Sequence, residues 1–352
     1  MTTEQQANRP VPTLEAVAAL AGVSRATVSR VVNGSPKVTP EVVETVTAAI
    51  AQLNYVPNRA ARSLATRRTQ VIALVVPEST ARVFADPFFA SIVQGVALYL
   101  ADTDYTLNML IASETHPDKT RRYLMSGNVD GALVVSHHSG DHSYAHLGHS
   151  LPIVFGGRPL NKSKPGSYFV DVDNVAAVES ATLHLIHQGR HSIATIAGPQ
   201  DMPPGVDRLA GWRKAMAAHG LDQSLVEFGD FAPQSGTAAM RRLLERGVPI
   251  DALFAANDQM AAGAYSAILE AGLSIPDDIA VVGFDDIDYA RLVKPSLTTV
   301  RQRQDALAEG LIAAMLGLLD NPDELPMVSV IPVELVVRES SGSGQAIRDG
   351  SR

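Results

Sequence analysis

Short apolar runs alternate with amphipathic segments along most of the chain, and this alternation limits the folds that it can adopt. The β-branched run at residues 71–77 has the length of a buried strand. Further strands are predicted at residues 105–110, 131–135, 153–155, 168–172, 193–197, 252–255 and 279–282. Helical spacing at residues 88–100, 175–188 and 259–271 lies between several of them, which is typical of right-handed βαβ crossovers. Because residues 70–339 exceed what one doubly wound sheet usually takes, we predict two α/β subdomains with a cleft between them.

The composition is that of a globular protein. Apolar residues make up 46% of the chain and charged residues 19%, which excludes an intrinsically disordered protein. No apolar stretch approaches the roughly 18–20 residues of a membrane span, and the N-terminus lacks the pattern of a secretory signal. Cysteine is absent, so disulfides, thiolate zinc sites and cysteine nucleophiles are excluded. We therefore expect no membrane association and a cytoplasmic location.

Charge is distributed unevenly along the chain. Residues 1–68 carry eight Lys or Arg and four Asp or Glu, a net charge of +4, whereas the remainder carries −12. A small basic segment on a large acidic body indicates an anionic partner for that segment. Nucleic acid is the expected partner.

The basic segment begins with a predicted helix-turn-helix. Thr13 can cap a first helix whose first turn carries Glu15, which is favourable near the helix N-terminus. Gly22 can adopt a positive φ in a three-residue turn, and Ser24 can cap the second helix. Two short helices joined in this way predict a DNA-binding element.

The second helix separates an apolar face from a polar one. Val28, Val31 and Val32 fall on one side, and a third helix after Thr39 carries an apolar stripe that would close a three-helix head. The opposite face is short and basic, as a helix in the major groove requires, although a solvated amphipathic helix would show the same pattern. Its members are Arg25, Ala26, Ser29, Arg30 and Asn33.

Three stretches of the basic segment carry a family resemblance. Residues 21–24, 27–33 and 53–58 read AGVS, TVSRVVN and LNYVPN, and residues 13–65 resemble the headpiece and hinge of the LacI/GalR family of bacterial transcriptional repressors. The resemblance continues to residues 338–340 as a periplasmic-binding-protein-like fold. It implies a helix-turn-helix headpiece at 1–56, a hinge helix or linker at 57–69, and an effector-binding and dimerisation core at 70–339. The polar residues 340–352 are expected to form a disordered tail.

The resemblance also implies DNA-contacting positions. Arg25 and Ala26 occupy variable base-reading positions, and Arg30 occupies that of a guanine-reading arginine. Asn58–Ala65 match a hinge helix that folds only on DNA, in which Asn58 and Ala61 lie and Leu64 is the minor-groove wedge. Positions that would place the head on the DNA are Leu14, Ser24, Asn33, Lys37 and Tyr55.

In the core, stretches that follow strands match the family's ligand-contact positions. Their side chains suit a sugar, because carboxylate, amide and guanidinium groups can pair with vicinal hydroxyls while an aromatic ring stacks on the apolar face of the sugar. Arg158 could instead form a structural salt bridge, and Asp173 is expected to cap a helix. The predicted effector residues are Asp86, Phe89, His137, Arg158, Arg208, Phe231, Asn257, Asp258, Asp285 and Gln302.

Together these features predict a repressor that binds a palindromic operator as a homodimer and is released by a sugar-like effector. A purine-like or sugar-phosphate corepressor is the alternative, and a cytoplasmic sugar-binding protein or an enzyme fits less well. Phosphate-loop, nucleophile-elbow and zinc-protease motifs are absent, so no catalytic residue and no cofactor are predicted. Residues 136–149 hold five of the ten histidines, but a polar surface loop is expected there rather than a metal site.

Overall fold

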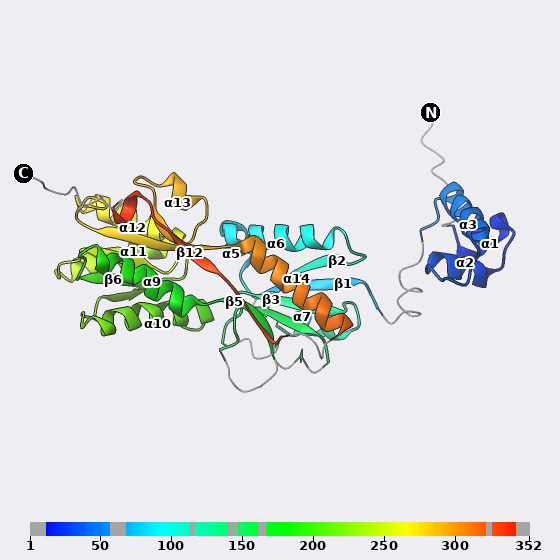
Figure 1. Ribbon diagram of the computed structural model, residues 1–352, viewed down its shortest axis with the longest axis horizontal. Coiled ribbons are helices and arrows are strands. Elements are labelled where there is room, and N and C mark those ends of the chain that lie inside the picture. Colours follow the sequence, from blue (N-terminus) through cyan, green and yellow to red (C-terminus); the bar gives the residue numbers. More distant parts are fainter. Residues whose placement is uncertain are drawn as a thin grey trace, which may run out of the picture. The chain divides into compact units, whose positions relative to one another are not determined.

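The computed structural model describes residues 12–56, 68–112, 117–139, 144, 147–148, 150–160, 167–321 and 326–342. The chain divides into two compact units, Met1–Gln70 and Val71–Arg352, which we call the head and the body (Figure 1). Most of the predicted hinge, including Asn58, Ala61 and Leu64, lies outside the described residues.

The head is a three-helix unit. The side chain of Thr13 accepts a hydrogen bond from the N–H of Ala16, and that of Ser24 accepts one from Thr27, so both predicted caps are confirmed. Gly22 ends the first helix with a φ of 65°, which a glycine adopts without strain. The helices are α1 (Leu14–Ala21), α2 (Arg25–Val32) and α3 (Pro40–Leu53).

A small apolar cluster holds the three helices together. Val31 and Val32 are half-buried and pack against it, which confirms the predicted inner face of α2. Thr39 lies at the N-cap of α3 as predicted, but its side chain makes no capping hydrogen bond. The fully packed members are Val17, Ala18, Val28, Val46, Ala49 and Tyr55.

The body contains two six-stranded sheets, one in each of two lobes. The first lobe has the strand order β11-β5-β4-β3-β1-β2, with every neighbouring pair parallel. The second has the order β12-β10-β9-β8-β6-β7, in which only the β10–β12 pair is antiparallel. These are the two α/β subdomains that the alternating pattern predicts. The strands are β1 (Val71–Val76), β2 (Thr106–Ile111), β3 (Gly131–Val135), β4 (Ile153–Gly156), β5 (Tyr168–Val172), β6 (Ile193–Ala197), β7 (Val226–Phe228), β8 (Ala252–Ala255), β9 (Ala280–Asp285), β10 (Thr298–Gln302), β11 (Val328–Ile331) and β12 (Val333–Val336).

Helices cover the sheets of both lobes. In the first lobe α14 packs against α6 and against the sheet, while in the second lobe α9 pairs with α10 and α11 with α12. The predicted helices at residues 88–100, 175–188 and 259–271 are each present within one residue at either end. The helices are α5 (Thr80–Ala85), α6 (Pro87–Leu100), α7 (Pro117–Met125), α9 (Asn174–His187), α10 (Pro203–Ala218), α11 (Pro233–Glu245), α12 (Asp258–Glu270), α13 (Tyr289–Leu292) and α14 (Gln304–Asp320).

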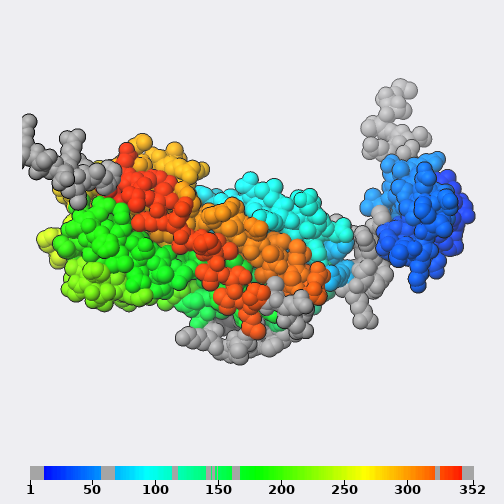
Figure 2. Space-filling view, in the orientation of Figure 1, coloured from blue at the N-terminus to red at the C-terminus, as the bar shows by residue number. Residues whose placement is uncertain are grey.

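The chain crosses between the lobes three times: between β5 and α9, between β10 and α14, and between β11 and β12. Figure 2 shows the last of these segments, in red, running along the surface of the body from one lobe to the other. The strand predictions did not include β7, β10, β11 or β12. Three of these strands are short and half-exposed, and β10, although mostly buried, has polar residues at four of its five positions. These crossovers are the only covalent connections between the lobes along the described chain.

The first two residues of the predicted disordered tail are ordered. Ser340 and Ser341 are fully buried in a short 3-10 helix, Glu339–Ser341. The hydroxyl of Ser340 donates to the carbonyl of Val281 (2.6 Å) and accepts from the N–H of Thr298 (2.7 Å). A polar sequence is ordered here because the buried N-terminal ends of β9 and β10 supply its partners. Residues 343–352 lie outside the described part.

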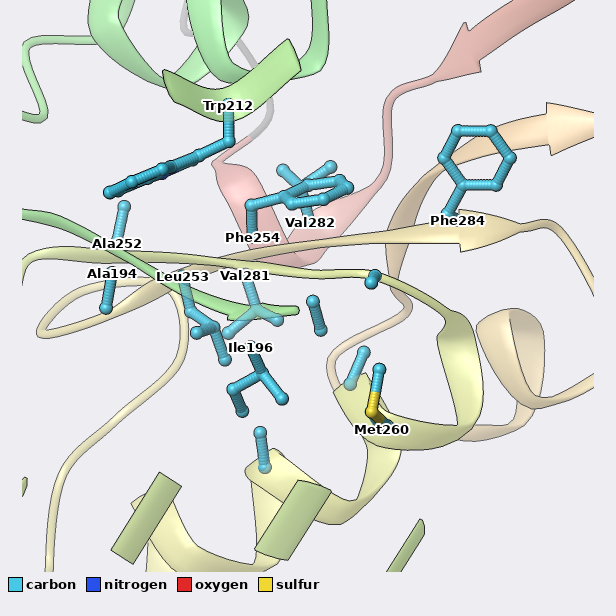
Figure 3. Packing of buried hydrophobic residues seen from close by; sticks show 14 of the residues in the cluster. Ala194, Ile196, Trp212, Ala252, Leu253, Phe254, Met260, Val281, Val282 and Phe284 are labelled. Carbon is cyan, nitrogen blue, oxygen red and sulfur yellow. The ribbon is translucent and has the colours of Figure 1, made fainter. Parts of the chain in front are cut away.

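Trp212 lies at the centre of the second lobe, on the face of α10 that covers the sheet (Figure 3). It is fully buried, together with Phe254 and Met216, and its indole N–H has no partner among the described residues. The contribution of this side chain to stability therefore comes from its apolar volume.

Trp212→Ala should lower the free energy of unfolding of the body by about 3–5 kcal/mol, because it leaves a large cavity. Trp212→Phe should cost much less, since the indole N–H that it removes has no partner to lose. Denaturant unfolding followed by circular dichroism measures both. Equal losses in the two variants would contradict this account of the core.

Candidate DNA-binding face and effector cleft

The predicted recognition face of α2 is accessible. Arg25, Ala26, Arg30 and Asn33 are exposed, while Ser29 is half-buried. Arg25 forms an exposed ion pair with Glu15 (3.2 Å), which is worth little in water and leaves the guanidinium able to exchange partners. The face therefore has the small, basic character needed to enter a major groove.

The remaining head positions differ in their environments. Ser24 is already engaged in capping α2, Lys37 is exposed, and Leu14 is half-buried against the head core. Tyr55 is only 7% exposed because its ring packs in that core. Only the edge of Tyr55 could reach a DNA backbone, so its main role in this fold is packing.

The body contains a cleft lined by residues of both lobes, with about 750 Å³ of space that is partly open to solvent. Eight of the ten predicted effector residues line it: Asp86, Phe89, His137, Arg208, Phe231, Asn257, Asp285 and Gln302. Lining residues that sequence reasoning missed include Arg82, Phe88, Ser136, Asp171, Asn174 and Met202.

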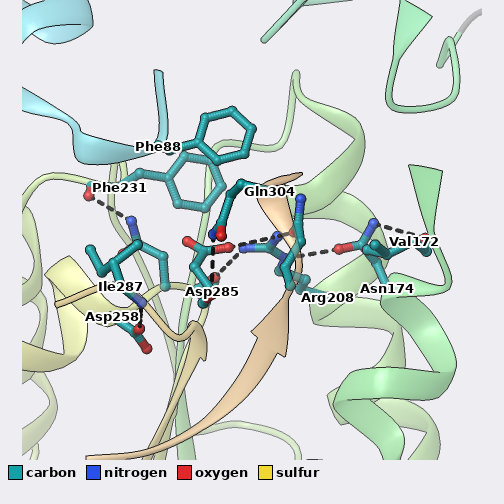
Figure 4. A network of polar contacts seen from close by, with 12 residues as sticks. Phe88, Val172, Asn174, Arg208, Phe231, Asp258, Asp285, Ile287 and Gln304 are labelled. Atoms are coloured by element: carbon teal, nitrogen blue, oxygen red, sulfur yellow. Dashed lines mark hydrogen bonds and ion pairs between the residues drawn. The ribbon is translucent and has the colours of Figure 1, made fainter. Parts of the chain in front are cut away.

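Arg208 of α10 is the buried centre of the cleft (Figure 4). Its Nε donates to Asn174 Oδ1 (2.9 Å), its Nη1 to the carbonyl of Ala256 (2.6 Å) and its Nη2 to Gln302 Oε1 (3.3 Å). Nη2 also lies 3.5 Å from Asp285 Oδ1. Burial lowers the pKa of the guanidinium, while the nearby carboxylates raise it again.

The guanidinium of Arg208 stacks on the ring of Phe284, with its central carbon 3.6 Å from the ring centroid. Every arm of the guanidinium therefore has a partner within the protein. Such a group is fixed in place before a ligand arrives.

Three carboxylates face the cleft. Burial raises the pKa of Asp285 to about 7, against the opposing effect of Arg208. Burial also raises the pKa values of Asp86 and Asp171, although backbone N–H donors partly offset this. Each carboxylate keeps acceptor capacity beyond its protein partners, which suits hydroxyl donors.

Phe231 provides an aromatic surface from the second lobe. It has a φ of 71°, and its ring packs so closely on Gly198 that a β-carbon there would overlap it. Asn257 Nδ2 donates to the carbonyl of Phe231 (2.9 Å), and Asn257 Oδ1 caps α12. Arg82 of the first lobe lies 5.7 Å from the ring centroid.

Two adjacent histidines after β3 have opposite electrostatics. Burial lowers the pKa of His137 to about 4, so the ring is neutral, and its Nε2 has no partner among the described residues. His138 contacts Glu78 Oε1 (3.3 Å) and Asp201 Oδ2 (2.8 Å), which raise its pKa to about 9. Because Asp201 belongs to the second lobe, His138 joins the two lobes at the cleft.

The comparisons with known proteins agree with this architecture. Residues 13–58 match the family described as bacterial regulatory proteins, lacI family, and residues 182–341 match the periplasmic binding protein-like domain. The chain is 44% identical over 333 residues to the HTH-type transcriptional regulator CelR of Thermobifida fusca, covering 94% of this chain and 98% of that protein. It is 34% identical over 320 residues to the ribose operon repressor of Escherichia coli K12, covering 88% and 94%.

The chain belongs to the LacI family.

Solved structures of LacI-family proteins share the fold. A CelR–cellobiose complex matches with a TM-score of 0.74 at 42% identity, covering 94% of this chain and 99% of that one. A lac repressor dimer bound to operator and the anti-inducer ONPF matches with a TM-score of 0.82 at 29% identity over the same shares. Since the relatives are regulators, this LacI-family chain is a transcriptional regulator and not an enzyme.

Two predicted effector residues of this LacI-family body do not line the cleft. Arg158 Nε donates to Asp207 Oδ2 (2.7 Å), so this residue forms the structural salt bridge that was the alternative to an effector contact. The salt bridge joins the two lobes. Asp258 is fully buried behind the cleft wall. Asp173 caps α9 through the N–H of Ala176 (2.9 Å), as predicted.

Among the described residues, no group of side chains could hold a metal ion. Within the same residues, no helix is both long enough and apolar enough to cross a membrane. Of the histidine-rich stretch, residues 140–143, 145–146 and 149 are outside the described part.

His138→Gln should destabilise the body most at pH 6.5 and below. The folded pKa of about 9 lies above the ordinary 6.5, so the stabilisation is complete below about pH 6.5 and is lost as the pH rises through 9. The melting temperatures of variant and wild type should differ by roughly 2–5 °C at pH 6.5 and converge by pH 10. His191→Gln, at an exposed position, is the control. A constant difference across this range would show that His138 does not carry the charge.

Proposed function

We propose that the protein is a repressor that binds a palindromic operator as a homodimer and leaves it when a sugar binds in the cleft of the body. The observation that carries the proposal is the presence, in one chain, of an exposed basic recognition helix and a cleft centred on the buried Arg208. A regulator of this kind acts in the cytoplasm, where the chromosome is.

The operator part of the proposal rests on the head. Arg30 projects from α2, where a guanidinium can pair with O6 and N7 of guanine, and Lys37 lies outside that helix as a candidate phosphate contact. One head offers few phosphate contacts, so tight binding calls for two heads on two half-sites. The relative solved with operator is a dimer, which supports the same arrangement here. Asn58, Ala61 and Leu64 would then act in a paired hinge at the operator centre.

The effector part rests on the chemistry of the cleft. Asp86, Asp171 and Asp285 offer acceptors, Phe231 offers a stacking surface, and neutral His137 offers a nitrogen that has no partner in the part of the chain that the structure describes. This set suits the hydroxyls and the apolar face of a sugar. Because a relative is solved with cellobiose, we propose a β-linked glucose disaccharide or a similar sugar as the first effector to test.

A sugar-phosphate corepressor fits the cleft less well. Arg208 donates to four protein acceptors, and Arg82 lies 3.5 Å from Glu78. A phosphate in the cleft would lie near three carboxylates. Both arginines of the described lining are already paired with protein acceptors, so neither is available to bind the phosphate. The cleft therefore favours a neutral sugar over a sugar phosphate as the effector.

Arg30→Ala should lower operator affinity by about 1–3 kcal/mol and relax the preference at one base pair of each half-site. Lys37→Ala should weaken binding to all sequences alike and reduce the slope of log K against log salt by about one. Fluorescence anisotropy with operator and scrambled duplexes at several salt concentrations separates the two. If Arg30→Ala lost affinity equally for both duplexes, the proposed base contact would be wrong.

Arg208→Ala should abolish release from the operator by cellobiose while operator affinity stays near that of the wild type. The substitution removes the donor network of the cleft and leaves Asp285 without its cation, at a cost to sugar binding on the order of 1–3 kcal/mol or more. Arg213→Ala, at an exposed position of the same helix, is the matched control. Calorimetry with cellobiose and operator release are the measurements, and unchanged sugar affinity in Arg208→Ala would place the site elsewhere.

A further inference from the structure

Asp258 is a buried carboxyl group without a role in the cleft itself. It is the first residue of α12, its side chain is 0% exposed, and it does not belong to the cleft lining. Burial of an ionisable group is unfavourable unless its polar atoms form hydrogen bonds, so a carboxyl group at this position requires partners within the protein. Its two oxygens have such partners.

Both oxygens of Asp258 hold neighbouring segments. Oδ2 accepts a hydrogen bond from the N–H of Ile287 (3.0 Å), and Oδ1 accepts one from the hydroxyl of Thr299 on β10 (2.6 Å). A β-carbon on Gly283 of β9 would overlap Oδ1, so the carboxyl group lies directly against that strand. Asp258 thus ties α12, β10 and the loop after β9 together.

The loop after β9 has an unfavourable backbone conformation. Asp285 and Asp286 have φ values of 110° and 57°, in the region that side chains other than glycine rarely adopt. Such residues persist only where the surroundings hold them. The N–H bound by Asp258 belongs to Ile287, the residue that directly follows this pair.

The two aspartates of the loop point to different partners. Asp285 lines the cleft beside Arg208. Asp286 is held by Arg301 Nε (2.6 Å) and by Arg338 Nη2 (2.5 Å), away from that guanidinium. The two consecutive carboxylates thus serve separate sites, and Figure 4 shows Asp258 and Ile287 to the left of Asp285.

We infer that Asp258 is a positioning residue, which holds the left-handed Asp285–Asp286 turn so that Asp285 presents its carboxylate to the effector. The inference rests on the proposed binding of a sugar in the cleft. Asp258 itself does not touch the effector, so its contribution to affinity is made through the backbone N–H of Ile287.

The ionisation state of Asp258 gives the inference a specific test. Burial, together with the negative neighbours Asp285 and Asp286, raises the pKa of Asp258 well above its usual range, while Arg208 is the nearby cation. A neutral carboxyl group has nearly the shape of an amide. In Asp258→Asn, the amide oxygen can accept from Ile287 and the amide nitrogen can donate to the hydroxyl of Thr299.

The experiment compares Asp258→Asn with Asp258→Ser in the full-length protein. Cellobiose affinity is measured by calorimetry, operator affinity by anisotropy, and hydrogen exchange of a peptide spanning residues 284–288 by mass spectrometry. Asp258→Asn should bind cellobiose within about threefold of the wild type and keep the exchange protection. Asp258→Ser cannot reach Ile287, so the protection should be lost and affinity should fall roughly 10- to 100-fold, with operator affinity unchanged. Asp278→Asn, an exposed carboxylate of the same lobe, is the control.

Several results would overturn the inference. They are wild-type affinity in Asp258→Ser, retained protection in that variant, or an Asn variant as impaired as the Ser variant. If Asp258→Ser fails to fold, Thr299→Val removes one contact of the carboxyl group; a loss of at least threefold is expected, and no loss overturns the role. If the wild type binds no sugar, the proposed function fails, whereas the exchange data still decide whether Asp258 holds the turn.

Discussion

The buried guanidinium of Arg208 is the interaction on which the body depends. Its donors reach Asn174, directly after the first crossover between the lobes, and Gln302, directly before the second, as well as the strand-end carbonyl of Ala256. A planar group with five fixed donors can satisfy such divergent acceptors, and a lysine cannot. The same cation pairs with Asp285, so a single side chain holds the second-lobe ends of two crossovers and offsets negative charge in the cleft.

The helices of the head could be predicted from local sequence signals. Caps at Thr13 and Ser24 and the glycine at position 22 act within a few residues of where they stand, and the structure confirms them. In the body, continuous apolar strands were equally clear, but β11 and β12 were not, because each is four residues long, partly exposed and interrupted by a polar residue. The fold class was therefore predictable, while the interlacing of the lobes was not.

In the cleft, too, some residues could be predicted from the sequence and others could not. Residues at or just after the ends of strands, such as Asn257 and Asp285, could be placed at the carboxyl edge of a sheet from the pattern and the family resemblance. The sequence could not show that Asp258 and Arg158 lie outside the cleft lining. The position of Asp258 depends on the backbone turn that brings Ile287 to its carboxyl group. The position of Arg158 depends on a partner in the other lobe, Asp207. The sequence could not show that His137 is buried and neutral, with a ring nitrogen that no other described residue contacts through a hydrogen bond.

The exchange of late segments between the lobes has a consequence for synthesis on the ribosome. The first lobe receives α14 and its edge strand β11, and the second lobe receives β12, only from the last fifty or so residues of the chain. Until α14, β11 and β12 have been synthesised, the apolar surface that Leu311 and Met315 will cover stays exposed. Neither lobe can therefore finish folding before the end of the chain is made. The head, in contrast, uses only local contacts. A chain cut short before residue 304 would carry a finished head on two unfinished lobes, which quality control can recognise by its exposed apolar faces before the product competes for DNA.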